Sequence, residues 1–357
     1  MKISTDHKED VPFTNIPSSG YEWWYFDAIS NEGEWSFVVI FYIGNPFSPE
    51  YIQNIAQHSA KPDAHPAVSI SVYHRSKAEF YSFVEYTETD LKWDEEKEIL
   101  KIHGNTFSKI TEEDVLIYQI RLNEKLESSH SISAQIEFKS RISNPALFKE
   151  SDEGAKRHFW NLVQPKADVK GNILIKGKTG SHQINFKGLG YHDHNVGLEP
   201  MKDDFIDWYW GRLHFEKFTL IYYVMNRKKE QQHRAWLVSS DNQKVLDKFD
   251  KVETEDKRTS LFGISSARKI ILKSKNSEVT IQANTLIDSG PFYQRFISKS
   301  IMNRNNEFTV TEGITEFIYP KNIYKKLYWP AVRMRLRFNQ KKPHWVQKFK
   351  MFYEWTW

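Results

Sequence analysis

Apolar and polar positions alternate with a period of two along most of this 357-residue chain. Such alternation, bounded by turn residues, is typical of strands that bury one face. The first half holds seven such segments, which are Trp35 to Ile43, Ala67 to Tyr73, Phe80 to Tyr86, Val115 to Leu122, Ile132 to Phe138, Ile173 to Ile175 and Ile184 to Leu189. Seven more follow, which are Trp208 to Phe215, Phe218 to Met225, Ala235 to Val238, Ile270 to Leu272, Val279 to Ala283, Phe308 to Phe317 and Val332 to Phe338. The pattern predicts an all-β protein whose antiparallel strands are joined by hairpins.

Helical periodicity is scarce, and only Tyr51 to His58 and Phe292 to Met302 are predicted as short helices. So many strands exceed the needs of one small barrel, which predicts either two β-barrels or one long continuous sandwich. Because no Pro/Gly/Ser-rich linker interrupts the chain, we expect two closely packed domains. A boundary near residue 200 divides the strands about evenly, giving an N-terminal domain of residues 1–200 and a C-terminal domain of residues 201–357.

The composition narrows the protein class. With 12 Trp, 17 Tyr and 24 Phe, the chain can build barrel cores and pockets for apolar or planar ligands. The absence of cysteine excludes disulfides and thiolate chemistry and fits a reducing compartment. The first residues contain no apolar signal region, and the longest apolar run, Trp35 to Ile43, is too short to cross a bilayer. We therefore expect a cytoplasmic protein without a transmembrane helix.

The charge is unevenly distributed. Residues 321–357 contain ten Lys or Arg and one acid, so this tail carries +9, while residues 1–320 carry 4 − 9 = −5. The tail also holds ten aromatic residues, and basic residues interleaved with aromatic ones can bind anionic lipid or single-stranded nucleic acid. The strict alternation from Val332 to Phe338 instead favours a strand with one solvated face. Peripheral association with the inner face of the membrane is the alternative, and we expect no nucleic-acid partner.

Three aromatic segments carry polar groups that could serve a site. In Glu22 to Asp27, the carboxylate of Glu22 lies between bulky aromatics, where burial is costly unless the group is paired or protonated. In Arg157 to Trp160, His158 and Trp160 share one face of an extended segment. The third segment, Trp208 to His214, includes Trp210 and Arg212. Each segment alone is better explained as part of a barrel wall than as part of a site.

The segment Gly190 to Gly197 is more informative, because it places a phenol, two imidazoles, a carboxyl and an amide between two glycines. On a strand, Tyr191, Asp193 and Asn195 share one face, and His192 and His194 share the other. The two histidines could bind a metal, with His158 or His214 as third ligand. The other interpretation makes Asp193 an acid held by Tyr191 and a neighbouring imidazole, and it requires a water-poor aromatic cavity that raises the proton affinity of the carboxyl.

These segments together resemble the carotenoid 1,2-hydratase (hydroxyneurosporene synthase) family. The resemblance rests on Glu22 to Ala28, His158-x-Trp160, Gly190 to Gly197, Trp210-Gly211-Arg212 and Gly313 to Phe317, and it extends from about Tyr21 to about Phe338. The wider relatives of this family are lipocalin-like proteins that include fungal Diels-Alderases. The implied fold is a tandem of two lipocalin-like barrels.

The resemblance also implies a reaction. The family adds water to an isolated terminal double bond of an acyclic isoprenoid without a cofactor, through protonation by an Asp and capture of the tertiary cation by water. By motif, the acid is Asp193, surrounded by Tyr191, His158 and Trp160. A dry site keeps a carboxylic acid neutral, and aromatic faces stabilise a cation, so the sequence is compatible with this chemistry. No metal or other cofactor is expected.

A second group of residues is expected to bind the substrate, an apolar isoprenoid or polyene. These residues are Glu22, Trp24, His192, His194, Asn195, Trp210 and Arg212. Two other functions remain open. A pericyclase would use the cavity to hold a reactive conformer and would need no proton donor. A carrier would only bind a hydrophobic small molecule, as single-barrel lipocalins do.

Overall fold

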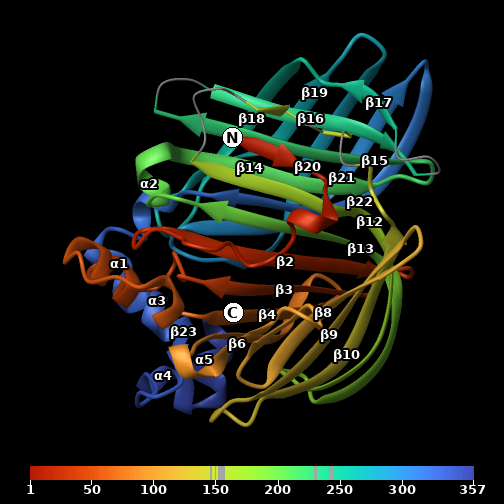
Figure 1. The fold of residues 1–357 in the computed structure, drawn as a ribbon. Helices are drawn as coiled ribbons and strands as arrows, with labels where there is room; N and C mark the ends of the chain where they lie inside the picture. The colour runs from red at the N-terminus through yellow and green to blue at the C-terminus, as the bar shows by residue number, and fades with distance from the viewer. Residues whose placement is uncertain (145–146, 149, 152–156, 229–230, 241–243) are drawn as a thin grey trace. The chain divides into compact units, whose positions relative to one another are not determined.

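The chain folds into two compact units, residues 1–200 together with 329–357, and residues 201–328. The computed structural model describes every residue except 145–146, 149, 152–156, 229–230 and 241–243 (Figure 1). Each unit contains one large, curled, mostly antiparallel sheet, which confirms the predicted all-β fold. The division differs from the expected one in one respect, because residues 329–357 belong to the first unit rather than to the C-terminal domain.

The sheet of the first unit runs in the order β23-β5-β4-β3-β2-β13-β12-β10-β9-β8-β7-β6, and β1 pairs with β11 and β12. Its strands are β1 (Lys2–Ser4), β2 (Tyr21–Ser30), β3 (Trp35–Ile43), β4 (Ala67–His74), β5 (Lys77–Glu85), β6 (Leu91–Asp94), β7 (Ile99–Ile102), β8 (Asn105–Glu112), β9 (Val115–Lys125), β10 (Ser131–Arg141), β11 (Glu150–Ser151), β12 (His158–Lys176), β13 (Ser181–Gly197) and β23 (Leu336–Phe338). Its helices are α1 (Pro49–Ala56), α3 (Trp329–Arg335), α4 (Trp345–Lys348) and α5 (Lys350–Trp355), with short 3₁₀ turns at η1 (His7–Glu9), η2 (Pro62–Ala64) and η3 (Glu88–Asp90).

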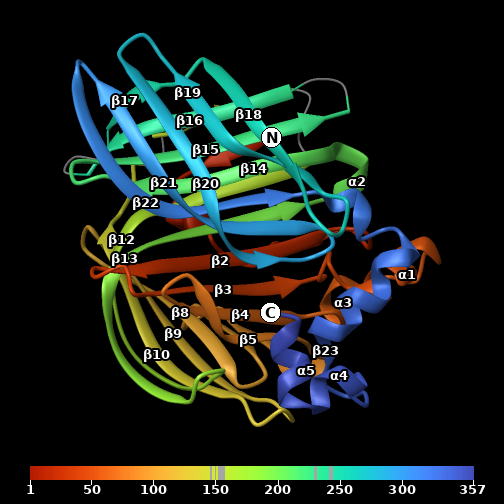
Figure 2. The same ribbon diagram turned by 180° about the vertical axis from the view of Figure 1, so that it is seen from behind.

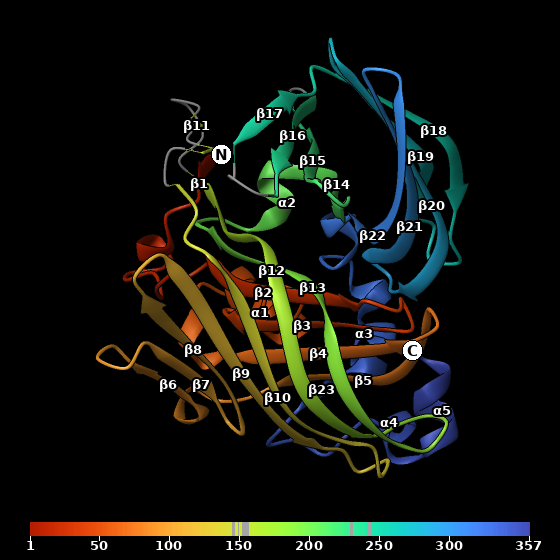
Figure 3. The same ribbon diagram turned by 90° about the vertical axis from the view of Figure 1, so that its right-hand side faces the viewer.

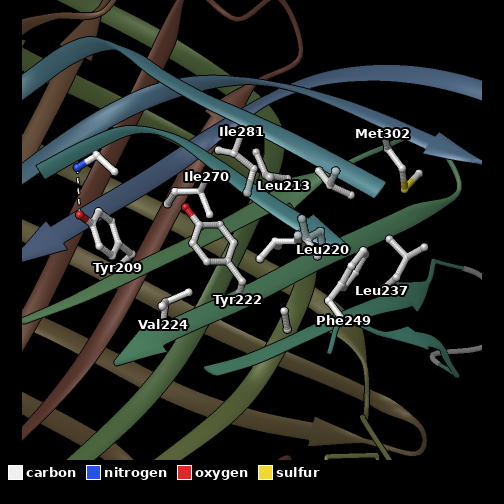
Figure 4. Close-up of a cluster of buried hydrophobic side chains, with 14 of the residues drawn as sticks. Tyr209, Leu213, Leu220, Tyr222, Val224, Leu237, Phe249, Ile270, Ile281 and Met302 are labelled. Carbon is white, nitrogen blue, oxygen red and sulfur yellow. Dashed lines mark hydrogen bonds between the residues drawn. The ribbon is translucent and has the colours of Figure 1, made fainter. Parts of the chain in front are cut away.

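The sheet of the second unit runs in the order β17-β16-β15-β14-β22-β21-β20-β19-β18. Its strands are β14 (Phe205–His214), β15 (Phe218–Arg227), β16 (Gln231–Ser239), β17 (Val245–Lys248), β18 (Lys251–Thr259), β19 (Ser265–Lys273), β20 (Ser277–Ser289), β21 (Tyr293–Arg304) and β22 (Glu307–Ile318), with α2 (Met201–Asp204), η4 (Pro320–Asn322) and η5 (Lys326–Tyr328) at its ends. Inward side chains such as Leu213, Tyr222 and Leu237 form its core, and the hydroxyl of Tyr209 accepts a 2.9 Å hydrogen bond from the amide of Ala267 (Figure 4).

Of the two predicted helices, one is confirmed and one is wrong. The segment Tyr51 to His58 lies largely in α1, which begins with Pro49 after the N-capping side chain of Ser48. The segment Phe292 to Met302 is instead strand β21, paired on both sides with β20 and β22. Phe292 and Phe296 imitate helical spacing, but alternate residues along the strand are buried from Phe296 to Met302.

The expected strand from Val332 to Phe338 is only partly correct. Residues up to Arg335 form helix α3, and only Leu336–Phe338 form a strand, β23, which pairs in parallel with β5. Trp329, Val332 and Leu336 are buried at helical spacing, so the alternation of arginines with apolar residues was misleading here. Figure 2 shows α3, α4 and α5 beside β5 and β23 of the first unit. Over the described part of the chain, every helix is too short or too polar to cross a bilayer.

The long strands β12 and β13 bend together along the first sheet (Figure 3). Their pairing is regular from Ala167 to Lys176 and again from His158 to Asn161, but the register shifts on either side of Gln164. Bulges of this kind bend a strand and redirect its side chains, and they are common beside active sites. They separate the end of β12 that carries His158 and Trp160 from the regular ladder of the sheet.

Candidate active site

The carboxyl group of Asp193 is held by three side chains of the first unit. Trp160 Nε1 and the hydroxyl of Tyr191 donate hydrogen bonds to Oδ2 at 2.7 and 2.8 Å, and Asn195 Nδ2 donates to Oδ1 at 2.9 Å. β12 and β13 place these groups together, because Trp160 pairs directly with Asn195, and residues two apart on β13 share a face. Asp193 is 4% exposed, so the arrangement lies in a buried environment.

His158 is linked to the acid through Asn195. The amide oxygen of Asn195 faces His158 Nε2 at 3.3 Å, and His158 Nδ1 faces the hydroxyl of Tyr21 at 3.4 Å. Because the amide nitrogen of Asn195 donates to Asp193, its oxygen must accept, which assigns the proton of the imidazole to Nε2. Tyr21, His158, Asn195 and Asp193 then form a chain in which each group donates to the next.

Tyr191 remains a proton donor in this arrangement. Burial, and next the neighbouring Asp193, raise the pKa of the Tyr191 phenol well above its ordinary value. The phenol therefore keeps its proton at neutral pH and donates it in a hydrogen bond to the carboxyl. Donors of this kind favour the ionised form of the acid, whereas burial favours the neutral form.

Aromatic rings of β2 lie on the same face as Asp193. Register places Tyr25 opposite Asp193 and Trp23 opposite Asn195. Trp23 stacks on Tyr21 with ring centroids 5.2 Å apart, and Tyr25 meets Tyr191 edge to face at 6.3 Å. The sequence instead predicts their neighbours Glu22 and Trp24 as substrate-binding residues. The alternation of β2 was readable in the sequence, but its register with β13 was not.

The ring of Tyr21 explains why the segment Gly190 to Gly197 ends in glycine. Gly197 pairs with Tyr21, and a Cβ at this position would lie 2.0 Å from the ring of Tyr21. No side chain fits at such a distance, so only glycine lets the tyrosine ring cross β13 there. The glycine thereby fixes the phenol that contacts His158.

The opposite face of β13 carries a second polar cluster, also within the first unit. His194 bridges two carboxyl groups, with Nε2 2.7 Å from Glu22 Oε1 and Nδ1 3.1 Å from Asp10 Oδ1. His192 Nε2 lies 3.2 Å from Asp10 Oδ2, and Trp24 Nε1 donates to Asp10 at 2.9 Å. We call Asp10, Glu22, Trp24, His192 and His194 the inner cluster; its side chains point away from Asp193.

Asp10 and His194 of the inner cluster keep their charges although they are buried. Burial disfavours the charge of Asp10, but His192 and His194 outweigh it and hold the pKa of Asp10 well below its ordinary value. Burial also opposes the charge of His194, yet the two carboxyl groups raise its pKa to about 9. Trp24 stacks on the ring of His194 at 4.5 Å, which further favours the cation. Burial raises the pKa of Glu22 despite its bond to His194.

The ring nitrogens of His192 and His194, the two suggested metal ligands, already have other partners. Both ring nitrogens of His192 and His194 face protein oxygens, including the carbonyl of Tyr25, 3.0 Å from His192 Nδ1. His158, one suggested third ligand, lies on the other face of the sheet. Among the residues that the structure describes, no group of three or more His, Asp or Glu side chains is arranged to hold a metal ion.

Trp210 and Arg212 lie in the second unit, on β14. Tyr209 and Leu213 of this strand point into the core of that unit, so Trp210 and Arg212 point to the opposite face of its sheet. Both side chains are buried. The role of these two residues in substrate binding stays a prediction.

Sequence reasoning missed Asp10 entirely. The residue follows the short turn η1 and precedes Val11-Pro12, in a segment without periodicity, and it enters the barrel only through long-range packing. β1 pairs with Phe159 to Asn161 of β12, and Asn161 Nδ2 donates to the carbonyl of Asp6 at 2.9 Å. These contacts bring Asp10 against His192 and His194, 182 and 184 positions later in the chain.

The model of the carotenoid hydratase CrtC family matches residues 39–342 of the chain. The chain belongs to this family. This confirms the resemblance, and the matched part includes every residue of the Asp193 site from His158 to Asn195. Among curated relatives, the hydroxyneurosporene dehydrogenase of Chlorobaculum tepidum is 29% identical over 352 residues, covering 92% of this chain and 90% of the relative. The acyclic carotenoid 1,2-hydratase of Rubrivivax gelatinosus is 25% identical over 220 residues, covering 60% of this chain and 50% of the relative.

Solved structures show that this CrtC-family chain has a lipocalin-like fold. CghA, crystallised with Sch210972, has a TM-score of 0.61 at 12% identity, and the likeness covers 85% of this chain and 89% of CghA. A protein described as AttH from Nitrosomonas europaea has a TM-score of 0.56 at 14% identity, covering 84% and 93% of the two chains. At these identities the likeness concerns the fold alone.

Proposed function

We propose that this protein is a cofactor-independent hydratase-like lyase, or a cyclase, that protonates an isolated double bond of an apolar isoprenoid or polyene. The observation that carries the proposal is the carboxyl of Asp193, buried and held by Trp160, Tyr191 and Asn195. Membership of the carotenoid hydratase family supports it, and so does the likeness to a relative named acyclic carotenoid 1,2-hydratase. The substrate we favour is therefore an acyclic carotenoid.

The proposed reaction has two steps. The carboxylic acid of Asp193 gives its proton to the less substituted carbon of the double bond, whose π electrons form the new C–H bond. The tertiary cation that results lies near aromatic rings such as Trp23 and Tyr25, whose faces attract positive charge. Water then forms the C–O bond and returns one proton to the Asp193 carboxylate, which regenerates the acid. In a cyclase, a second double bond would attack the cation instead.

The hydrogen bonds to Asp193 have a chemical purpose in this scheme. They stabilise the carboxylate that remains after proton transfer, so they make the buried acid stronger at the moment of reaction. The chain from Tyr21 through His158 and Asn195 orients the carboxyl. His158 is thus a positioning residue, one step removed from the proton donor.

The test compares wild type with Asp193→Asn, using an acyclic carotenoid in D₂O. Loss of a positioned general acid is expected to reduce the rate about 10²- to 10⁴-fold. The wild-type product should carry one deuterium, on the carbon adjacent to the one that bears the new hydroxyl group. The matched control is Asp168→Asn, which alters an exposed carboxylate on the same strand as Trp160 and should leave the rate unchanged.

The outcomes separate the rival functions. A product without deuterium, formed equally by wild type and Asp193→Asn, would indicate a pericyclase that needs no proton donor. Tight binding of the carotenoid with no product would indicate a carrier. Either result, from variants whose circular dichroism shows a native fold, contradicts the proposed acid catalysis.

We also infer that the C-terminal segment, residues 329–357, associates with an anionic membrane surface, where an apolar polyene would be dissolved. α4 and α5 expose a group of large apolar side chains, which are Trp345, Phe349, Met351, Phe352 and Trp355, with exposures of 56, 57, 71, 42 and 78%. Trp345 and Phe349 both contact the ring of Phe352, at 5.5 and 6.0 Å, so three of them form one patch. The exposed residues Lys342, Lys348 and Lys350 adjoin it in sequence. Exposed aromatics beside lysines are typical of interfacial anchors.

Vesicle co-sedimentation tests this inference. Wild type should sediment with anionic vesicles at low salt and less at high salt, because each basic residue near such a surface contributes roughly 1 kcal/mol that salt screens. The triple variant Trp345→Ser, Phe349→Ser, Phe352→Ser should lose this binding. The control Phe308→Ser, Val310→Ser removes exposed apolar side chains from β22 and should bind as wild type does. Equal binding by both variants, or none by wild type, would exclude a membrane role for this segment.

A further inference from the structure

A cavity of about 950 Å³ opens within the first unit beside the inner cluster. Its walls come from the N-terminal segment around Phe13, from the end of β3 at Ile43, and from β6 and β7 through Leu91, Trp93 and Leu100. The volume is in the range of pockets that hold small organic ligands. Because Glu22 lines the cavity and pairs with Val196 across β2 and β13, the cavity lies on the face of the sheet opposite Asp193.

Glu22 carries an unsatisfied oxygen at this cavity. Its Oε1 accepts hydrogen bonds from His194 at 2.7 Å and from the amide of Phe13 at 2.9 Å. Its Oε2 is buried without a hydrogen-bond partner, and the whole side chain has no exposed surface. Because this oxygen is covered, a donor group on a ligand reaches it only after the Glu22 side chain turns toward the cavity. The hydrogen bond made there recovers the free energy that the unpaired oxygen costs.

The charge of the side chains that line the cavity determines which kind of ligand donor group can bind there. Besides Glu22, the carboxyl groups of Asp63, Glu95, Glu96 and Glu98 line the cavity, and no Lys, Arg or His is among its described lining residues. Glu98 is paired with Lys109 at 2.7 Å. Burial, and next the neighbouring Glu88, raise the pKa of Asp63, as expected where negative charges accumulate. This environment attracts a positive charge and repels an anion.

The apolar walls of the cavity determine what the rest of the ligand must be. Phe13, Ile43, Leu91, Trp93 and Leu100 present apolar surface, and the rings of Phe13 and Trp93 can face a cation. A hydrated metal ion would make no use of such walls. An ammonium group attached to an alkyl or aryl body would fill both parts of the site.

We propose that this cavity is a second binding site of the protein, which takes an apolar organic cation whose ammonium group donates a hydrogen bond to Glu22. The site is separate from the Asp193 cluster and does not depend on the proposed reaction. Much of it lies outside the part of the chain that matches the family model, since Phe13 and Glu22 precede residue 39.

Isothermal titration calorimetry of the full chain tests the proposal with three probes of one size, hexylammonium, hexan-1-ol and hexanoate. Wild type should bind hexylammonium at least tenfold more tightly than hexan-1-ol and should not bind hexanoate measurably. Glu22→Gln should weaken hexylammonium binding about tenfold to a hundredfold, the usual value of a hydrogen bond to a charged group. Glu112→Gln, at an exposed acid of β8, is the matched control and should bind as wild type does.

A second variant covers the case in which Glu22→Gln disturbs the inner cluster. Trp93→Ala alters a partly exposed wall of the cavity away from His194, and it should weaken hexylammonium binding several-fold while the protein stays folded. Asp193→Asn should bind hexylammonium as wild type does, whatever happens to its activity. Equal affinity for hexylammonium and hexan-1-ol, no binding by wild type, or loss of binding in Asp193→Asn would each overturn the proposal.

Discussion

Two donors meet at one oxygen of Asp193, since Trp160 and Tyr191 both bind Oδ2. A carboxyl held in this way cannot rotate without breaking both bonds, so its orientation toward a substrate is fixed. The indole of Trp160 cannot ionise, and the raised pKa of Tyr191 keeps the phenol neutral. The acid is therefore positioned by two groups that cannot compete with it for the transferred proton.

Tyr191→Phe tests this positioning. It removes one donor to Asp193 and should reduce kcat about 10- to 100-fold, because hydrogen bonds to charged groups contribute roughly 1.5 to 3 kcal/mol. Steady-state kinetics with an acyclic carotenoid measure the effect. The control is Tyr86→Phe, which removes a similar phenol–carboxylate bond to Glu124 in the same unit. If both variants lowered kcat equally, the effect would reflect general stability rather than the orientation of the acid.

For single residues, the sequence was informative where several polar side chains lie within a few positions of one another. Asp193, Tyr191 and Asn195 could be grouped because alternation puts residues two apart on one face of a strand. Asp10 could not be found in the same way. Its role arises from contacts with residues about 180 positions away, and an Asp after a polar turn has no local signature of burial.

The strand β13 carries a pH-dependent contribution to stability through His194. Its pKa of about 9 in the folded protein exceeds the ordinary 6.5, so the folded state binds this proton more tightly. The stabilisation is complete below about pH 6.5 and is lost as the pH rises to about 9. The raised pKa of Glu22 acts in the same direction. Asp10 acts in the opposite one, since its lowered pKa stabilises the fold above about pH 3.8 and that contribution is lost at lower pH.

His194→Gln should abolish most of this pH dependence. The pKa difference corresponds to about 3 kcal/mol, so the variant should be less stable than wild type by about that amount at pH 6. The difference should shrink toward pH 9. Urea unfolding followed by near-ultraviolet circular dichroism measures both values. His103→Gln is the control, because His103 pairs with Asp90 at 3.0 Å but is half exposed. A variant that kept the wild-type slope between pH 6.5 and 9 would contradict the assignment.

Strands were easier to predict than the way they pair. Period-two alternation located most of them, but it could not distinguish Glu22 and Trp24 from Trp23 and Tyr25 as neighbours of Asp193. That choice depends on register, which long-range pairing sets. Alternation also misled at residues 329–336, where the arginines of α3 happen to alternate with apolar residues although burial follows helical spacing.

For the whole molecule, the C-terminal segment has a structural role that its composition conceals. β23 extends the first sheet beyond β5, and the hydroxyl of Tyr353 donates to the carbonyl of Tyr81 at 3.4 Å. His130 Nε2 lies 2.9 Å from the carboxylate of Glu354. The C-terminal segment, residues 329–357, therefore follows the second unit in sequence but completes the sheet of the first unit.

Deletion of residues 329–357 should destabilise the first unit selectively. The edge of β5 would lose its partner and apolar residues such as Leu336 would no longer cover the sheet. Hydrogen exchange followed by mass spectrometry should show faster exchange in β4 and β5. Exchange in β14 and β15 should be unchanged, because the core of the second unit is built from residues 201–328. Faster exchange confined to β14 and β15 would contradict the grouping of the chain.

The alternation of β13 limits how the protein can be redesigned. A one-residue insertion between Tyr191 and His194 would exchange the two faces and turn the histidines toward the place of the acid. Engineering of either face must therefore keep the length of this segment and substitute side chains singly. The residues that follow Asp10 offer another route, because Val11 to Ile16 line the cavity beside the inner cluster. Libraries that diversify residues 11–16 could alter ligand selectivity in this cavity without replacing any side chain that bonds to Asp193.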